Sequence, residues 1–172
     1  NGSAMGEHKS EKINPYNAGM RGKKNSEYDG GHRVPFFIRW KNGNIEAGRD
    51  ISQITSHIDV LPTLIDLCNL EDKYQTIYDG KSLVPLLNNE FYHWNDRILI
   101  TDSQRLQHPV KWRKSAVMSD KYRLVNGTEL YNISDDPSQQ NDIAEQHPEI
   151  VNQYREVYEV WWTDVSERFD EY

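Results

Sequence analysis

The segment GKKNSEYDGGHRVP, residues 22–35, determines how the rest of the chain is interpreted. It places two lysines, acidic residues and a glycine pair directly before an apolar run at residues 34–40. The residues before this run are polar, rich in glycine and without hydrophobic periodicity. Long irregular segments of this kind are uncommon inside compact domains and are usually functional or disordered. We therefore expect residues 1–34 to form a functional loop that neighbouring elements hold in place.

The first part of the chain, residues 1–89, has the pattern of a piece of a large α/β domain. The apolar run at residues 34–40 fits a strand buried on both faces, a type that belongs to larger α/β sheets. Apolar residues at positions 58, 61, 64, 65 and 68 follow a helical spacing, and Pro62 suits the first turn of that helix. Cys68 lies on this apolar stripe, so we expect it to be a small buried hydrophobic residue.

The second part, residues 90–172, has the pattern of a small α+β subdomain. Four short apolar segments separated by turn residues, at 97–101, 115–119, 122–125 and 129–132, predict an antiparallel meander. Pro148 then opens a helix whose apolar residues fall along one face. We expect this helix to cover one face of the meander.

Composition excludes several classes of partner. The 172 residues carry a formal net charge of −7, which argues against a nucleic-acid or anionic-membrane surface. No apolar run approaches the ~20 residues of a membrane-spanning helix. The chain has 36% hydrophobic residues, which is lean for a free-standing domain of this size. It has a single cysteine, which excludes an internal disulfide.

Several short motifs occur along the chain in one order. Asn1-Gly2 is followed by Lys24 and, four positions after that lysine, by YDGGHRVP at residues 28–35. Further on come HIDVLPT at residues 57–63, DGKSLVPLL at 79–87 and ELYNISDDPSQQNDIA at 129–144. In this order the motifs resemble those of the C-terminal portion of the type I sulfatases, which share the alkaline-phosphatase-like fold. The resemblance spans nearly the whole chain.

The resemblance implies a fold and an activity. It implies the C-terminal part of an α/β sulfatase fold ending in a small α+β subdomain, in an enzyme that hydrolyses a sulfated small molecule or sulfated glycan. The nucleophile of that family is a formylglycine made from a Cys/Ser-x-Pro-x-Arg motif, beside a Ca²⁺ ion. Cys68 is followed by Asn-Leu-Glu-Asp, which does not match. We therefore expect the formylglycine and most Ca²⁺ ligands in an N-terminal part that is missing here, and we expect this segment alone to be inactive.

The start of the chain has an explanation in the same resemblance. Asn1-Gly2 is similar to the second half of the family's Ca²⁺-binding Asp-Asn-Gly, so residue 1 is expected to be a cut point. The missing N-terminal part is then the expected partner of this chain. The family also implies a periplasmic or secreted location.

The resemblance assigns roles to individual residues. Asn1 would supply a neutral amide oxygen to Ca²⁺, a cation that prefers oxygen ligands. Lys24 would place its ammonium group on a sulfate oxygen as a point charge. Spacing alone favours solvated loop charges for Lys23 and Lys24, and the resemblance reverses that preference. Weaker candidates for substrate binding follow at four other positions: His8, Lys12, Arg105 and His108.

Residues around these candidates are expected to be structural. Gly30 and Gly31 allow the loop to turn sharply into the following strand. Asp29 and Arg33 flank that turn as anchors that could pair with one another or with the missing domain. His57 and Asp59 are two residues apart and so lie on different helix faces, which makes them a cap and an anchor rather than a metal pair.

Two alternatives stay open at this point. A phosphatase or phosphonate hydrolase of the same superfamily would generally have Asp-His where this chain has Asn1, which favours the sulfatase. A non-catalytic carbohydrate-binding or structural module would be built on residues 90–172, and residues 1–40 would then be dispensable. The sulfatase interpretation instead expects residues 1–40 to fold only against the missing sheet.

Overall fold

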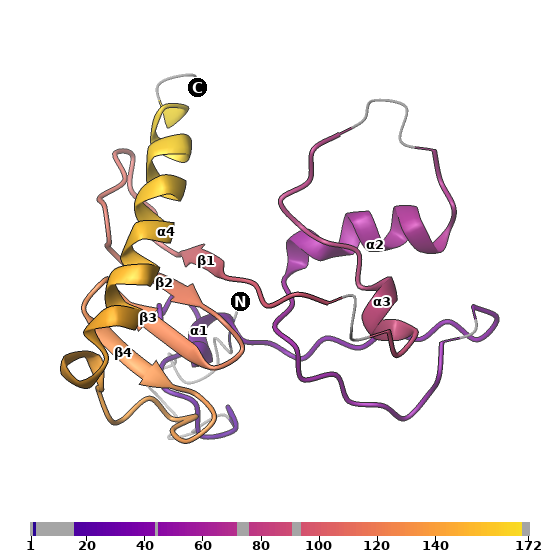
Figure 1. Ribbon diagram of the computed structural model, residues 1–172, viewed down its shortest axis with the longest axis horizontal. Coiled ribbons are helices and arrows are strands. Elements are labelled where there is room, and N and C mark those ends of the chain that lie inside the picture. The colour runs from indigo at the N-terminus through magenta and orange to yellow at the C-terminus, as the bar shows by residue number, and fades with distance from the viewer. Residues whose placement is uncertain (1, 3–15, 44, 72–75, 91–93, 170–172) are drawn as a thin grey trace, which may run out of the picture. The chain divides into compact units, whose positions relative to one another are not determined.

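The computed structural model describes residues 2, 16–43, 45–71, 76–90 and 94–169 (Figure 1). The chain forms two compact units. One contains the described residues up to Pro35 together with those from Ile98 onward, and the other is Phe36–Arg97. The loop that holds Lys24 thus packs with the C-terminal sheet in this chain, so the expectation that residues 1–40 fold only against the missing sheet is wrong for residues 16–35. The expected boundary between the large α/β domain, residues 1–89, and the α+β subdomain, residues 90–172, stays a prediction for the whole protein.

The first unit is built on a four-stranded antiparallel sheet, as the sequence predicts. Its strands lie in chain order as β1 Leu99–Asp102, β2 Ser115–Met118, β3 Tyr122–Val125 and β4 Glu129–Asn132. The turn between β3 and β4 has positive φ at Asn126 (49°) and Gly127 (71°). Two consecutive residues with positive φ form a turn whose twist matches that of the two strands of a hairpin. Asparagine and glycine are the residues that adopt positive φ most readily. Local turn chemistry therefore favours the pairing of β3 with β4.

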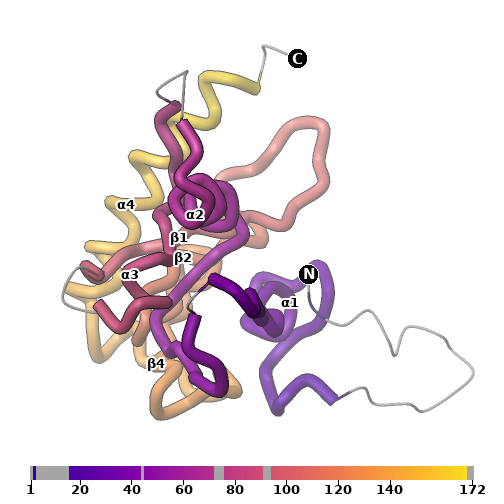
Figure 2. Tube along the Cα trace, turned by 90° about the vertical axis from the view of Figure 1, so that its right-hand side faces the viewer, coloured from indigo at the N-terminus to yellow at the C-terminus, as the bar shows by residue number. Residues whose placement is uncertain are grey.

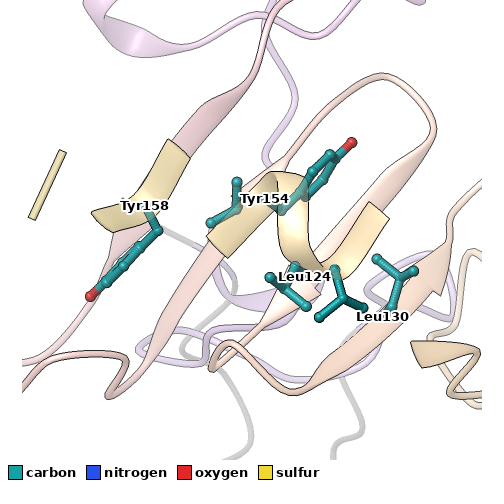
Figure 3. Close-up of a cluster of buried hydrophobic side chains, with 6 residues drawn as sticks. Leu124, Leu130, Tyr154 and Tyr158 are labelled. Atoms are coloured by element: carbon teal, nitrogen blue, oxygen red, sulfur yellow. The ribbon is translucent and has the colours of Figure 1, made fainter. Parts of the chain in front are cut away.

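The C-terminal helix α4, Pro148–Ser166, covers one face of this sheet, which confirms the sequence prediction (Figure 1). The core between them contains Val117, Leu124, Leu130, Val151, Tyr154 and Tyr158, several of which are labelled in Figure 3. Burying one such Val or Leu side chain stabilises the fold by roughly 1.5–3 kcal/mol. The two tyrosine hydroxyls are paired, since Tyr154 donates to Ser119 Oγ at 2.6 Å and Tyr158 accepts from the Trp112 amide at 3.0 Å.

The opposite face of the sheet is covered by the loop that precedes Pro35. This loop contains the short helix α1, Asp29–His32, and Figure 2 shows α1 and α4 on opposite sides of the sheet. Successive residues of a strand point to opposite faces, so Leu124 faces α4 while Arg123 faces the loop. The contact between Arg123 and Asp29 confirms this placement. The sheet is therefore the middle layer of the unit.

The second unit contains η1 His57–Asp59, α2 Val60–Leu67 and α3 Val84–Leu87. Its core gathers Leu83, Leu86 and Leu87, with Ile45, Ile51, Leu67 and Trp94 packed against them. Asp59 is fully buried and is the anchor expected from the sequence. Its carboxylate accepts hydrogen bonds from the Ser56 and Lys81 amides and from the Arg97 guanidinium, at 2.7–2.9 Å.

Two expectations for this part of the chain are wrong in the structure. Residues 34–40 form no strand, and Phe36 and Phe37 are 52% and 90% exposed. A strand buried on both faces needs neighbouring strands for its backbone groups, and none of the described residues pairs with this segment. Cys68, expected to be buried, is exposed at the end of α2. Within the described ranges, no helix is long and apolar enough to cross a membrane.

Candidate functional site

A buried ion pair holds the loop against the sheet. Asp29 is fully buried, and Arg123 Nε donates to its Oδ1 at 3.0 Å. The Asp29 amide donates to Gln139 Oε1 at 2.8 Å, and Gln139 is also fully buried. Arg33 NH1 lies 3.6 Å from Asp29 Oδ2, which confirms the pairing of these two residues. The sequence did not identify Arg123 as the main partner.

A second set of contacts joins the start of the loop to β4. The Arg21 guanidinium lies 3.8 Å from the Tyr28 ring centroid and donates to the Tyr131 hydroxyl at 2.9 Å. Stacking of this kind is attractive because the ring face carries negative charge density. Tyr28 donates its hydroxyl hydrogen to the Glu129 carboxylate at 2.9 Å. Burial, helped by that carboxylate, raises the pKa of Tyr28 to about 12, so the hydroxyl remains a donor at neutral pH.

Glycines close the loop on itself through backbone contacts. A Cβ atom on Gly30 would lie 2.3 Å from the Gly22 carbonyl oxygen, and one on Gly31 would lie 2.0 Å from the Ser26 carbonyl oxygen. These positions require glycine because backbone segments approach closely, rather than because φ is positive. The Gly2 amide donates to the Gly31 carbonyl at 2.7 Å. Gly2 of the first motif therefore lies beside the glycine pair of the 28–35 motif.

Lys24 lies on the rim of this loop. The Ser26 amide donates to the Lys23 carbonyl at 2.8 Å, and Asn25 has φ of 71°, so the chain turns sharply at Lys24. The ammonium group of Lys24 makes no hydrogen bond or ion pair with any residue that the structure describes. An open depression surrounds it, lined by Gly22, Lys23, Lys24, Asn25, Ser26, Glu27 and Lys114. This lysine is therefore presented to solvent with its charge available for an anion.

The other candidate residues have different positions. Arg105 and His108 are exposed in the loop between β1 and β2, and neither lines the depression around Lys24. Asn1, His8 and Lys12 lie outside the described residues. The roles of these residues stay predictions. Lys114, which no motif marked, is the residue of the β1–β2 loop that lines the depression with Lys24.

His32 is a structural histidine in this loop. Its side chain is 20% exposed, and its Nε2 lies 3.1 Å from the Glu27 carbonyl oxygen. Burial lowers the pKa of His32 below its usual value, although the nearby Asp29 carboxylate opposes the shift. The neutral ring can donate from Nε2 to the Glu27 carbonyl. Protonation of His32 would add a positive charge to a poorly solvated site that already contains the Arg123 guanidinium.

We expect this histidine to make the unit less stable in acid. The folded state binds the proton more weakly than the unfolded chain, whose histidine pKa is about 6.5. The stabilisation is therefore complete above pH of about 6.5 and declines as the pH falls below it. In His32→Gln the amide can keep the bond to Glu27 and cannot titrate, so unfolding temperature should depend less on pH between about 7.5 and 5. Identical pH dependence in both proteins would contradict this role.

Comparison with known proteins shows one family over most of the chain. Residues 22–161 match the family model described as N-sulphoglucosamine sulphohydrolase, C-terminal. The chain is 31% identical to mouse steryl-sulfatase over 117 residues, which cover 67% of this chain and 19% of that protein. It is 26% identical to an N-acetylgalactosamine-6-O-sulfatase of Bacteroides thetaiotaomicron over 155 residues, covering 81% of this chain and 29% of that one.

A solved structure has the same fold. It was solved in work on the metabolism of multiple glycosaminoglycans by Bacteroides thetaiotaomicron. The TM-score is 0.64 at 24% identity, over 85% of this chain and 32% of that one. The chain thus spans less than a third of each of these proteins. Since the family model covers most of its length, the chain belongs to the sulfatases and is a C-terminal portion of their α/β fold.

Proposed function

We propose that this chain forms part of an enzyme that hydrolyses sulfate esters, and that Lys24 binds the sulfate group. One observation carries the proposal. Lys24 has an available ammonium group, and it lies in a loop that a buried ion pair, Asp29 with Arg123, fixes to the sheet. A fixed loop holds a charge in one place before the substrate arrives. Preorganised charges of this kind stabilise a transition state without further rearrangement.

The chemistry of a sulfate ester suits such a lysine. Its non-bridging oxygens carry negative charge, and the leaving oxygen gains charge as its bond to sulfur breaks. A lysine ammonium interacts with such oxygens as a compact charge with three donors. The chain as a whole carries a net charge of −7, so a depression lined by three lysines is a local exception. An anion is therefore the ligand that this depression fits best.

The nucleophile and most metal ligands are proposed to lie elsewhere in the enzyme. Within the described ranges, no three His, Cys, Asp or Glu side chains are placed to bind a metal ion. Asn1 would contribute an amide oxygen to Ca²⁺, and the bond from Gly2 to Gly31 ties the neighbouring residue to the loop. Bound Ca²⁺ and formylglycine would supply charge stabilisation and a nucleophile. Without them, we propose that residues 1–172 are inactive alone.

The activity can be tested on the full-length protein. We expect it to release sulfate from 4-nitrophenyl sulfate or from N-acetylgalactosamine 6-sulfate, the kind of ester named for one relative. Phosphate esters of the same alcohols should react more slowly. The isolated 172-residue chain serves as the control and should release no sulfate. Faster release of phosphate than of sulfate would favour a phosphatase instead, and no release of either would favour a non-catalytic module.

A further inference from the structure

Lys114 brings a second cation to the depression around Lys24. It lies at the end of the β1–β2 loop, directly before β2, and it is half-buried. Its Nζ donates to the Asn25 carbonyl oxygen at 3.3 Å, across 89 positions of sequence. Lys114 forms no ion pair with a described residue, and its hydrogen bond to a neutral carbonyl leaves its positive charge available. Two lysines from separate segments therefore share one concave surface.

The balance of charge at this surface is positive. Among the described residues that line the depression, Lys24 and Lys114 carry positive charges and Glu27 carries the carboxylate. One oxygen of Glu27 already accepts a hydrogen bond from Asn126 Nδ2 at 3.1 Å. Positive charge concentrated in a concave place raises the local concentration of anions. Lys24 and Lys114 extend from separate segments, so each can face a different anionic group of one ligand.

The backbone around Lys114 is strained and firmly held. Trp112 and Lys114 have φ of 63° and 53°, in the left-handed region, which costs of order 1–3 kcal/mol for each such residue. Packing keeps them there, because the Trp112 ring stacks on Tyr158 at a centroid distance of 3.7 Å. The Lys114 carbonyl accepts from the Ser103 amide at 3.0 Å. The hydrophobic core thus fixes the point from which the Lys114 side chain extends.

We propose that Lys114 binds a second anionic group of the substrate, a sulfate or a carboxylate next to the ester bound at Lys24. The inference rests on the proposed function and narrows it. The preferred substrates would be sulfated glycans with two neighbouring anionic groups, rather than neutral molecules with one sulfate. Lys114 then determines the preference for substrates with two anionic groups, while Lys24 binds the reacting sulfate of every substrate.

The test compares three substrates of the full-length enzyme. One is 4-nitrophenyl sulfate, with a single anionic group. The second is a disulfated N-acetylgalactosamine, and the third is a disaccharide that joins a uronic acid to a monosulfated N-acetylgalactosamine. We expect Lys114→Gln to lower kcat/KM for a two-anion substrate about ten-fold relative to kcat/KM for 4-nitrophenyl sulfate. The change should come mainly from a higher KM for the two-anion substrate. The two-anion substrate that shows the fall identifies the second group as sulfate or carboxylate.

Controls separate this role from simple support of the loop. Lys114→Arg keeps the charge and should retain most of the wild-type preference in kcat/KM for the two-anion substrate over 4-nitrophenyl sulfate. Lys121→Gln removes an exposed lysine that does not line the depression, and it should leave this preference unchanged. An equal loss on all three substrates would mean that Lys114 only supports the loop, and no loss would mean that it does not bind substrate. Either result overturns the inference, and a wild-type enzyme inactive on all three overturns the proposed function as well.

Discussion

Replacing Lys24 with alanine is expected to lower kcat/KM for sulfate-ester hydrolysis by the full-length protein about 10²–10³-fold, the usual cost of removing one preorganised group that stabilises charge in a transition state. Lys24 contacts no other described side chain through a hydrogen bond or ion pair, so its loss should leave the unfolding temperature within about 1 °C of wild type. The measurement is steady-state kinetics on 4-nitrophenyl sulfate.

Two further variants test whether the effect comes from the charge of Lys24 at its own position. Lys24→Arg keeps a positive charge with a different shape and should recover part of the activity. Lys121→Ala removes an exposed lysine from the β2–β3 turn, and its kcat/KM should match wild type. A Lys24→Ala enzyme with wild-type kcat/KM would contradict the role given to Lys24.

Replacing Arg123 with methionine is expected to destabilise the first unit by about 3–5 kcal/mol, because it leaves the fully buried Asp29 carboxylate without its main partner. Arg123 also donates to the carbonyl oxygens of Ser119 and Tyr122. The side chain of Arg33 is 56% exposed and lies farther from Asp29, so it cannot replace Arg123. The loss of unfolding free energy should appear as faster hydrogen exchange in the peptides that contain Gly30 and Leu124.

The matched control is an ion pair on the surface. Arg168 and Asp164 lie 2.9 Å apart with both side chains more than 60% exposed, so Arg168→Met should cost less than about 1 kcal/mol. Adding Asp29→Asn to Arg123→Met should restore part of the lost stability, since the uncompensated charge is then removed. Equal costs for Arg123→Met and Arg168→Met would show that the buried pair does not hold the loop.

Features that depend on local sequence could be predicted. The strands of the meander, the hairpin turn at Asn126-Gly127 and helix α4 follow from alternation, turn residues and helical periodicity within a few positions. Asp59 was also identified as an anchor, because its spacing from His57 excludes a shared helix face. The family resemblance came from short motifs whose order the chain preserves.

Features that join distant segments could not be predicted. Arg123 and Asp29 are 94 positions apart, and Lys114 and Asn25 are 89 apart. One signal for the first pair is present, because Arg123 interrupts an apolar strand on the face opposite Leu124, where a buried charge needs a partner. The strand expected at residues 34–40 was wrong because apolar content favours burial only when a neighbouring sheet is available.

The most direct measurement is a crystal structure of the full-length protein with sulfate or an unreactive sulfate ester bound at its catalytic centre. We predict that Lys24 Nζ lies about 2.7–3.0 Å from a sulfate oxygen, the range of a charge-assisted hydrogen bond. A sulfate bound at that centre while Lys24 remains in solvent would contradict it.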